Sequence, residues 1–211
     1  MRTRDIMTTN VVTVDEKTSV IDAKRIMEAH RIRRLPVMSR DKLVGLVTKH
    51  RLLEVAPSPA TSLSKWELNY LLDKLTVKEI MVKNPCTITP DAPLEEALRM
   101  GQEKCYGAFP VVEDGRLVGM VTESDIVRLM TEALGVTEKG THVEIKIPHM
   151  NGNMQKILKV LDRHKTGLLS LVTFKGAGDG DATIALRLER KDTEPVAREL
   201  ESSGFHISYA G

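Results

Sequence analysis

The hydrophobic and polar positions of the chain follow one order twice within its N-terminal two thirds. In each copy, apolar residues at helical spacing come first, and two short apolar runs joined by a polar turn follow. This pattern predicts a helix, a β-hairpin and the start of a second helix in each copy. The predicted segments are Val20–His30, Leu35–Met38 and Leu43–Val47 in the first copy, and Leu94–Glu103, Phe109–Val112 and Leu117–Val121 in the second. The second helices are predicted to begin near Lys49 and Glu123.

The two copies form an internal repeat. Residues 4–52 align with residues 78–126 without a gap, at a constant offset of 74 residues that pairs Pro36 with Pro110 and Gly45 with Gly119. One such unit is too small to bury its own apolar faces. We therefore expect the copies to pack on each other, and an interface between related sheets creates clefts in which small ligands sit.

The end of the second hairpin carries the clearest chemical signal. The strand runs through Met120 to Thr122 and into a helix, whose first backbone N–H groups attract a phosphate. The Thr122 hydroxyl can add a donor, and the Asp125 carboxylate can accept hydrogen bonds from the hydroxyls of a ribose. The same residues also fit a plain helix start, with Thr122 as N-cap and Asp125 as an acidic first-turn residue. In the first copy Thr48 is kept but Arg51 replaces the acid, so the two sites are not expected to be equivalent.

The segments before the hairpins differ in charge. The first copy has three arginines within four residues, Arg31, Arg33 and Arg34. Arginine pairs well with phosphate oxygens, although a solvated basic turn explains the same residues. The second copy has the apolar stretch Cys105–Pro110 there, in which Gly107 allows the close approach of a flat ring. We expect the second copy to supply the base and ribose pocket, and the first copy to reach across with arginine toward phosphates.

The repeat and its motifs resemble the CBS-domain family, in which paired repeats form a Bateman module. The matching motifs are Asp5-Ile6-Met7 and Glu79-Ile80-Met81, Leu35-Pro36-Val37 and Phe109-Pro110-Val111, and Gly119-x-x-Thr122-x-x-Asp125. The resemblance implies an adenosyl ligand, such as AMP, ADP, ATP, S-adenosylmethionine or a dinucleotide. It implies that the base lies near Ala92, Tyr106, Gly107, Ala108 and Met120. It also implies that Thr122 contacts phosphate or ribose, that Asp125 binds the ribose hydroxyls and that Arg33 and Arg34 meet phosphates; it leaves open the site around Thr48.

The pattern changes after Gly135. A strand, a helix, two strands, a helix and a strand are predicted over Val143–Pro148, Asn153–His164, Leu168–Lys175, Ala182–Glu189, Thr193–Ser202 and Phe205–Tyr209. This βαββαβ order is that of a ferredoxin-like fold. It is similar to ACT domains, which pair side by side and often bind amino acids. The stretch His149–Asn153 lies where that family places a ligand-contacting loop, although an ordinary turn and helix cap explains it as well.

The prediction for the whole chain is an α/β (α+β) protein with two CBS repeats packed as a Bateman module and a βαββαβ ferredoxin-like ACT domain. The predicted boundaries are 1–55 for the first repeat, 56–76 for a linker with a bridging helix, 77–134 for the second repeat and 141–211 for the ACT-like domain. Ser64–Glu67 fits a capping box at the start of the bridging helix, with Trp66 as a packing anchor. The whole order resembles the acetoin-utilisation accessory proteins.

Composition narrows the function classes. The chain has 31 Lys and Arg against 29 Asp and Glu, a net charge of +2, which gives no case for nucleic acid or an anionic membrane as a partner. Two cysteines, Cys86 and Cys105, do not make a disulfide framework. The sequence has neither a signal-peptide pattern nor a run of apolar residues long enough for a membrane span, so we expect a cytoplasmic location.

The favoured function is a ligand sensor. The sequence has no nucleophile–base motif and no closely spaced histidines, so neither an enzyme nor a metal site is expected. We expect a homodimer, with no obligatory cofactor, in which an adenine nucleotide between the repeats modulates an unidentified partner or the ACT-like domain. Two alternatives stay open: a constitutive scaffold with vestigial pockets, and an amino-acid sensor that works through the ACT-like domain.

Overall fold

The computed structural model describes residues 1–55, 65–104, 107–147, 152–175, 182–189 and 192–211. The chain forms two compact units, Met1–Ile126 and Val127–Gly211, each with a hydrophobic core of its own. The division falls within helix α6 (Glu123–Ala133), which starts in the second repeat. No helix within the described ranges is long and apolar enough to span a membrane.

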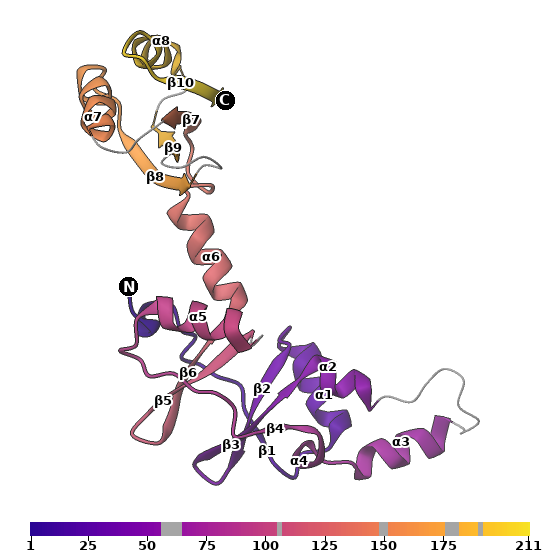
Figure 1. Cartoon of the computed structure of the whole chain (residues 1–211). Coiled ribbons are helices and arrows are strands. Elements are labelled where there is room, and N and C mark those ends of the chain that lie inside the picture. The colour runs from indigo at the N-terminus through magenta and orange to yellow at the C-terminus, as the bar shows by residue number, and fades with distance from the viewer. Residues whose placement is uncertain (56–64, 105–106, 148–151, 176–181, 190–191) are drawn as a thin grey trace. The chain divides into compact units, whose positions relative to one another are not determined.

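The first unit contains the two repeats (Figure 1). The elements of the first repeat are η1 (Thr3–Asp5), β1 (Val14–Asp15), α1 (Val20–Ala29), β2 (Arg34–Ser39), β3 (Lys42–Thr48) and α2 (Lys49–Glu54). Helix α3 (Lys65–Lys74) precedes the second repeat, whose elements are α4 (Val77–Ile80), β4 (Val82–Lys83), α5 (Leu94–Lys104), β5 (Ala108–Glu113), β6 (Arg116–Thr122) and α6. The predicted helices and hairpins of both repeats are confirmed, with small differences at their ends.

The two repeats exchange their N-terminal segments. Strand β4 precedes the second hairpin in sequence but pairs with β3 of the first repeat, so that the sheet order is β1-β2-β3-β4. The reciprocal contact joins Thr8 to Met120 of β6, and both backbone N–H groups donate to the opposite carbonyl at 2.9 Å. Each repeat therefore completes the sheet of the other, which is why the two copies form one compact unit.

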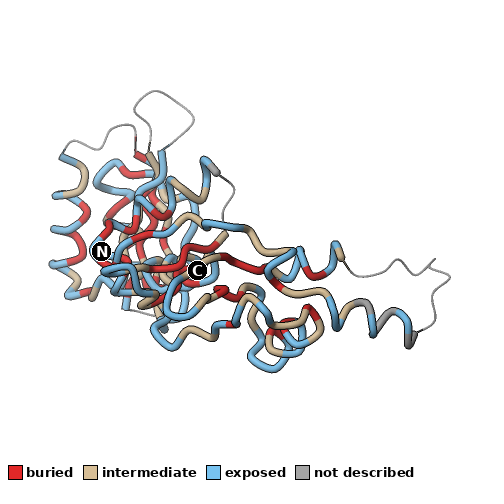
Figure 2. The backbone as a smooth tube through the Cα atoms, turned by 90° about the horizontal axis from the view of Figure 1, so that it is seen from below, coloured by how far each residue is buried: buried red, intermediate tan, exposed pale blue. Residues whose placement is uncertain are grey.

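The core of the first unit follows the hydrophobic pattern of the strands. Leu35, Val37 and Val47 are fully buried between the first hairpin and helices α1 and α2. A smaller apolar cluster joins the two hairpins, with Leu46 from β3, and Ala108 and Met120 from β5 and β6. In Figure 2 the buried residues run along the strands and the inner sides of the helices. Burial of side chains of this size contributes about 1.5–3 kcal/mol each.

The second unit is built from a four-stranded antiparallel sheet and two helices. Its elements are β7 (Thr141–Ile147), α7 (Asn153–Arg163), β8 (Leu168–Lys175), β9 (Ala182–Leu188), α8 (Glu194–Ser202) and β10 (His206–Ala210). The strand order is β10-β7-β9-β8, and all neighbouring pairs are antiparallel. This confirms the predicted βαββαβ order and gives the topology of a ferredoxin-like fold.

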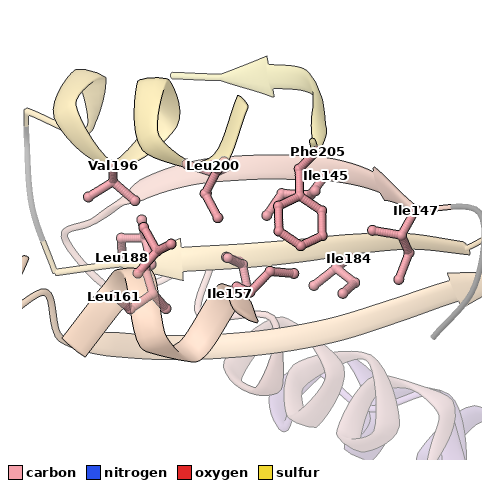
Figure 3. Close-up of a cluster of buried hydrophobic side chains, with 12 residues drawn as sticks. Ile145, Ile147, Ile157, Leu161, Ile184, Leu188, Val196, Leu200 and Phe205 are labelled. Carbon is pink, nitrogen blue, oxygen red and sulfur yellow. The ribbon is translucent and has the colours of Figure 1, made fainter. Parts of the chain in front are cut away.

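The helices of the second unit cover one face of the sheet (Figure 3). Ile157 and Leu161 extend from α7 and Leu200 extends from α8 toward Ile145 and Ile184 of the central strands. Each of these side chains is almost completely buried. The apolar residues of α7 and α8 recur at helical spacing, so that one stripe of each helix meets the sheet.

Several predictions fall on residues outside the described ranges. These are the capping residue Ser64, the base-contacting residue Tyr106, the cysteine Cys105 and the loop residues His149–Asn151.

Candidate functional site

A cavity of about 250 Å³ lies at the junction of the two repeats in the first unit, and we refer to it as the Asp125 cavity. The exchanged N-terminal segment lines it with Thr8, Asn10, Val11 and Val12. The turn into β2 contributes Arg31–Arg34. The end of β6 and the start of α6 contribute Met120, Thr122, Ser124 and Asp125. The site thus combines an apolar wall with polar groups from both repeats, as small-molecule sites commonly do.

The start of α6 fixes the two polar residues predicted to bind ribose and phosphate. The Thr122 hydroxyl and backbone N–H both donate to Asp125 Oδ2, at 2.7 Å and 2.9 Å. The Asp125 backbone N–H lies 3.4 Å from Thr122 Oγ1. Asp125 is 8% exposed and borders the cavity. Thr122 therefore caps helix α6, as one of the two interpretations predicted. The same hydrogen bonds hold Asp125 next to the cavity.

Three arginines of the turn into β2, Arg31, Arg33 and Arg34, also line the cavity. Helix α1 ends at Ala29 with His30 as its C-cap, and Arg31 adopts a left-handed conformation with φ +53°, which turns the chain toward β2. Burial lowers the pKa of Arg34 below its ordinary value, the Glu123 carboxylate opposes this shift, and the Arg33 charge adds to it. Arg31 and Arg33 also border a second cavity of about 310 Å³ between α1 and α2. Among the described residues, the lining of this cavity thus combines three arginines with the acidic residue Asp125.

A smaller cavity of about 160 Å³, the Thr48 cavity, is the repeat-related counterpart. Its lining residues are Arg34, Leu46, Thr48, Val82, Pro85, Cys86, Gly107 and Ala108. Thr48 caps α2 by accepting a hydrogen bond from the Arg51 backbone N–H at 3.2 Å. The Arg51 side chain pairs with Glu54 on the same helix at 3.1 Å. At the position that corresponds to Asp125, helix α2 therefore carries Arg51, which pairs with Glu54 of the same helix.

The structure divides the predicted ligand residues between these two cavities. Arg33, Met120, Thr122 and Asp125 line the Asp125 cavity, while Thr48, Gly107 and Ala108 line the Thr48 cavity, and Arg34 borders both. Ala92 borders neither; its carbonyl accepts hydrogen bonds from the Thr3 backbone N–H at 3.0 Å and hydroxyl at 3.1 Å. The sequence analysis expected Gly107, Ala108 and Met120 around one base, whereas the structure places Gly107 and Ala108 at the Thr48 cavity and Met120 at the Asp125 cavity. The physical reason is the exchange of segments, which brings the start of each hairpin beside the end of the other.

Sequence reasoning missed the N-terminal segment of the Asp125 cavity. Thr8, Asn10, Val11 and Val12 precede the first strand and have no charge or motif of their own. A signal was available, because Asn10 and Asn84 coincide in the repeat alignment. Ser124 was also missed, although it lies between the two predicted residues of α6.

Paired repeats of this architecture, with a ligand-sized cavity at their junction, define a class of small-molecule-binding modules. The sequence matches the CBS domain family over residues 4–58 and 77–132, and the chain belongs to this family.

The similar proteins cover mainly this paired module. Homoserine O-acetyltransferase from Methanohalobium evestigatum is 37% identical over 132 residues, which are 61% of this chain and 24% of that enzyme. A CBS domain-containing protein from Dictyostelium discoideum is 32% identical over 133 residues, which are 62% of this chain and 92% of that protein. The chain thus spans about a quarter of the first relative's length and nearly all of the second's.

Solved structures support the same fold. The CBS domain pair of protein MJ0100, in complex with 5′-methylthioadenosine and S-adenosyl-L-methionine, matches with a TM-score of 0.51 and 28% identity over 62% of this chain and 95% of that one. CBSX2 in complex with AMP matches with a TM-score of 0.53 and 30% identity over 65% and 99%. A Vibrio cholerae protein described as an acetoin utilization protein (AcuB) matches with a TM-score of 0.54 and 29% identity over 66% and 96%.

Proposed function

We propose that this protein is a regulatory adenosine-ligand sensor and that its ligand occupies the Asp125 cavity. The observation that carries this proposal is the buried Asp125 at a cavity that Arg31, Arg33 and Arg34 also line. The cavity of about 250 Å³ is slightly smaller than the about 300–1,000 Å³ that is usual for ligand pockets, which suits one small ligand of nucleoside size. The solved CBS pairs with AMP, or with S-adenosyl-L-methionine and 5′-methylthioadenosine, support this ligand class.

In this proposal Asp125 accepts hydrogen bonds from the ribose hydroxyls. A carboxylate has about four acceptor positions, and both bonds from Thr122 fall on Oδ2. Met120 contacts the adenine base, and Arg33 and Arg34 bind the phosphates of the nucleotide. Thr48, Gly107 and Ala108 would serve a second ligand in the Thr48 cavity, and Ala92 has a backbone role against Thr3.

Ligand binding regulates only if the ligand prefers one of two states of the protein. We propose that the response acts on a partner protein or on the second unit, that the protein is not itself an enzyme, and that it works as a homodimer. We assign the second unit to the ACT-like class, which its strand order β10-β7-β9-β8 supports. Edge strand β8 exposes Leu168, Leu169 and Phe174, which favours side-by-side pairing of two copies.

A thermal-shift screen of the whole chain tests the ligand class. The panel comprises AMP, ADP, ATP, S-adenosylmethionine, NAD, cyclic dinucleotides and amino acids. A ligand at about 100 times its Kd adds about 2.7 kcal/mol, which raises Tm by about 5–10 °C. The Asp125→Ala variant should lose this shift. The matched control Arg51→Ala changes the equivalent helix position in the first repeat and should keep it.

The outcomes separate the competing functions. A shift with an adenosyl ligand that Asp125→Ala removes supports the proposal. No shift with any adenosyl ligand would favour a constitutive scaffold. A shift with an amino acid alone would move the sensor to the second unit.

A further inference from the structure

Arg34 is a partly desolvated cation with a long ion pair. Its side chain is 25% exposed, and Nη2 lies 3.8 Å from Oε2 of Glu123, the first residue of α6. An arginine stays protonated in proteins, so the desolvated charge is best stabilised by a close anion. Glu123 is 72% exposed and compensates this charge only weakly at that distance.

Gly107 makes room for this ion pair. A Cβ added at Gly107 would lie 2.1 Å from Arg34 Nη2 and 2.8 Å from Glu123 Oε2. The Gly107 carbonyl accepts a hydrogen bond from the Glu123 backbone N–H at 3.1 Å. The pair therefore lies against Gly107, which precedes β5, and Arg34 borders both cavities.

Comparison of the two repeats shows that more arginines line the Asp125 cavity than the Thr48 cavity. At the offset of 74 residues, Arg33 and Arg34 correspond to Gly107 and Ala108, and Glu123 corresponds to Lys49. In the part of the chain that the structure describes, three arginines and one carboxylate line the Asp125 cavity, and one charged residue, Arg34, borders the Thr48 cavity. The excess of positive charge repels the cationic sulfonium of S-adenosylmethionine. It does not strengthen the binding of adenosine, which is neutral.

We propose that the Asp125 cavity selects phosphorylated adenine nucleotides over adenosine and S-adenosylmethionine, and that Glu123 competes with the ligand phosphate for Arg34. This inference rests on the proposed function, because it assumes that an adenosine ligand occupies the cavity. A phosphate carries more charge than a carboxylate and offers oxygens that match the guanidinium fork. Since the Glu123 side chain is mostly exposed, it returns to water when the phosphate arrives.

Isothermal titration calorimetry of the whole chain with ATP, ADP, AMP, adenosine and S-adenosylmethionine tests the inference. The nucleotides should bind about tenfold or more tightly than adenosine and S-adenosylmethionine, and raising the salt concentration should reduce this advantage. Glu123→Gln should tighten nucleotide binding about two- to fivefold and leave adenosine binding unchanged. In an Arg34→Gln background, Glu123→Gln should give no gain.

Glu113→Gln is the matched control, because it makes the same charge change at the turn end of the hairpin, far from the paired Ala108 and Thr122. It should leave all affinities unchanged. Equal binding of adenosine and ATP would overturn the inference and leave the proposed function intact. Unchanged or weaker nucleotide binding by Glu123→Gln would overturn the competition. If no adenosine ligand bound at all, the proposed function would fail and the inference with it.

Discussion

Gly45 lies against Met81 so closely that a Cβ added at Gly45 would be 2.2 Å from the Met81 sulfur atom. The repeat-related pair shows the same relationship, since a Cβ at Gly119 would be 2.6 Å from the Met7 sulfur atom. In both pairs the glycine belongs to the last hairpin strand of one repeat, and the methionine belongs to the exchanged segment of the other. The close packing therefore marks the place where each repeat receives the N-terminal segment of its neighbour.

This packing predicts that Gly119→Ala destabilises the first unit. The added methyl group would also lie 3.2 Å from the Thr8 carbonyl, whose oxygen accepts the Met120 backbone N–H. Overpacking of this kind costs about 1–3 kcal/mol. Chemical denaturation of Gly119→Ala, Met7→Ala and the double variant measures the coupling. Strictly additive effects of the two changes would contradict the proposed clash.

Gly107→Ala should behave differently, because the described atoms nearest to its methyl group are the ends of the Arg34 and Glu123 side chains. Both ends can move, so we expect a change in unfolding free energy within about 1 kcal/mol, of either sign. Nucleotide affinity should change, because Arg34 must leave its position. Calorimetric titration with ATP measures this, and an unaltered affinity would mean that the position of Arg34 does not matter for binding.

A comparison of Thr122→Ala with Thr48→Ala distinguishes the helix-capping role of a threonine from a role in ligand binding. Each caps a helix, so Thr122→Ala and Thr48→Ala should each cost about 0.5–2 kcal/mol of stability. Only Thr122→Ala should also reduce the thermal shift that an adenine nucleotide produces. The paired measurement is the melting temperature of each variant with and without the nucleotide. An equal nucleotide shift in both variants would limit Thr122 to its structural role.

Acid should weaken the contact between Glu16 of the first repeat and Lys78 of α4. A hydrogen bond from Lys78, 3.1 Å away, and one from Ser39 lower the pKa of Glu16 below its ordinary value of 4.5. Because the native pKa is the lower one, the stabilisation is complete above the ordinary value. It is lost as the pH falls through the native pKa. Unfolding midpoints between about pH 7 and pH 3 should show a smaller acid loss for Glu16→Gln and Lys78→Gln than for the unmodified chain. Identical curves would rule out this contribution.

Leu200→Ala tests whether the two units unfold separately. Leu200 is fully buried against the sheet of the second unit, and its truncation should cost about 2–5 kcal/mol. Differential scanning calorimetry should show a lower transition for the second unit, while the nucleotide-induced shift of the first unit persists. Leu35→Ala, in the core of the first unit, should have the opposite effect. Loss of the nucleotide shift in Leu200→Ala would show that the units are coupled.

The sequence by itself determined the local elements and their repetition. The alignment of residues 4–52 with 78–126 established two related repeats, because hydrophobic periodicity and turn residues are local properties. The same properties predicted the βαββαβ order of the second unit and the helix start at Thr122. The domain boundaries and the roles of the site residues stay predictions.

Only the tertiary structure decided which residues share a cavity. Strand pairing joins Thr8 to Met120 and β4 to β3 across long stretches of sequence, and local patterns do not encode such contacts. This exchange places the arginines of the first repeat beside Asp125 and places Gly107 and Ala108 beside Thr48. The residues were recognisable from their chemistry, but their partners depend on how each repeat completes the sheet of the other.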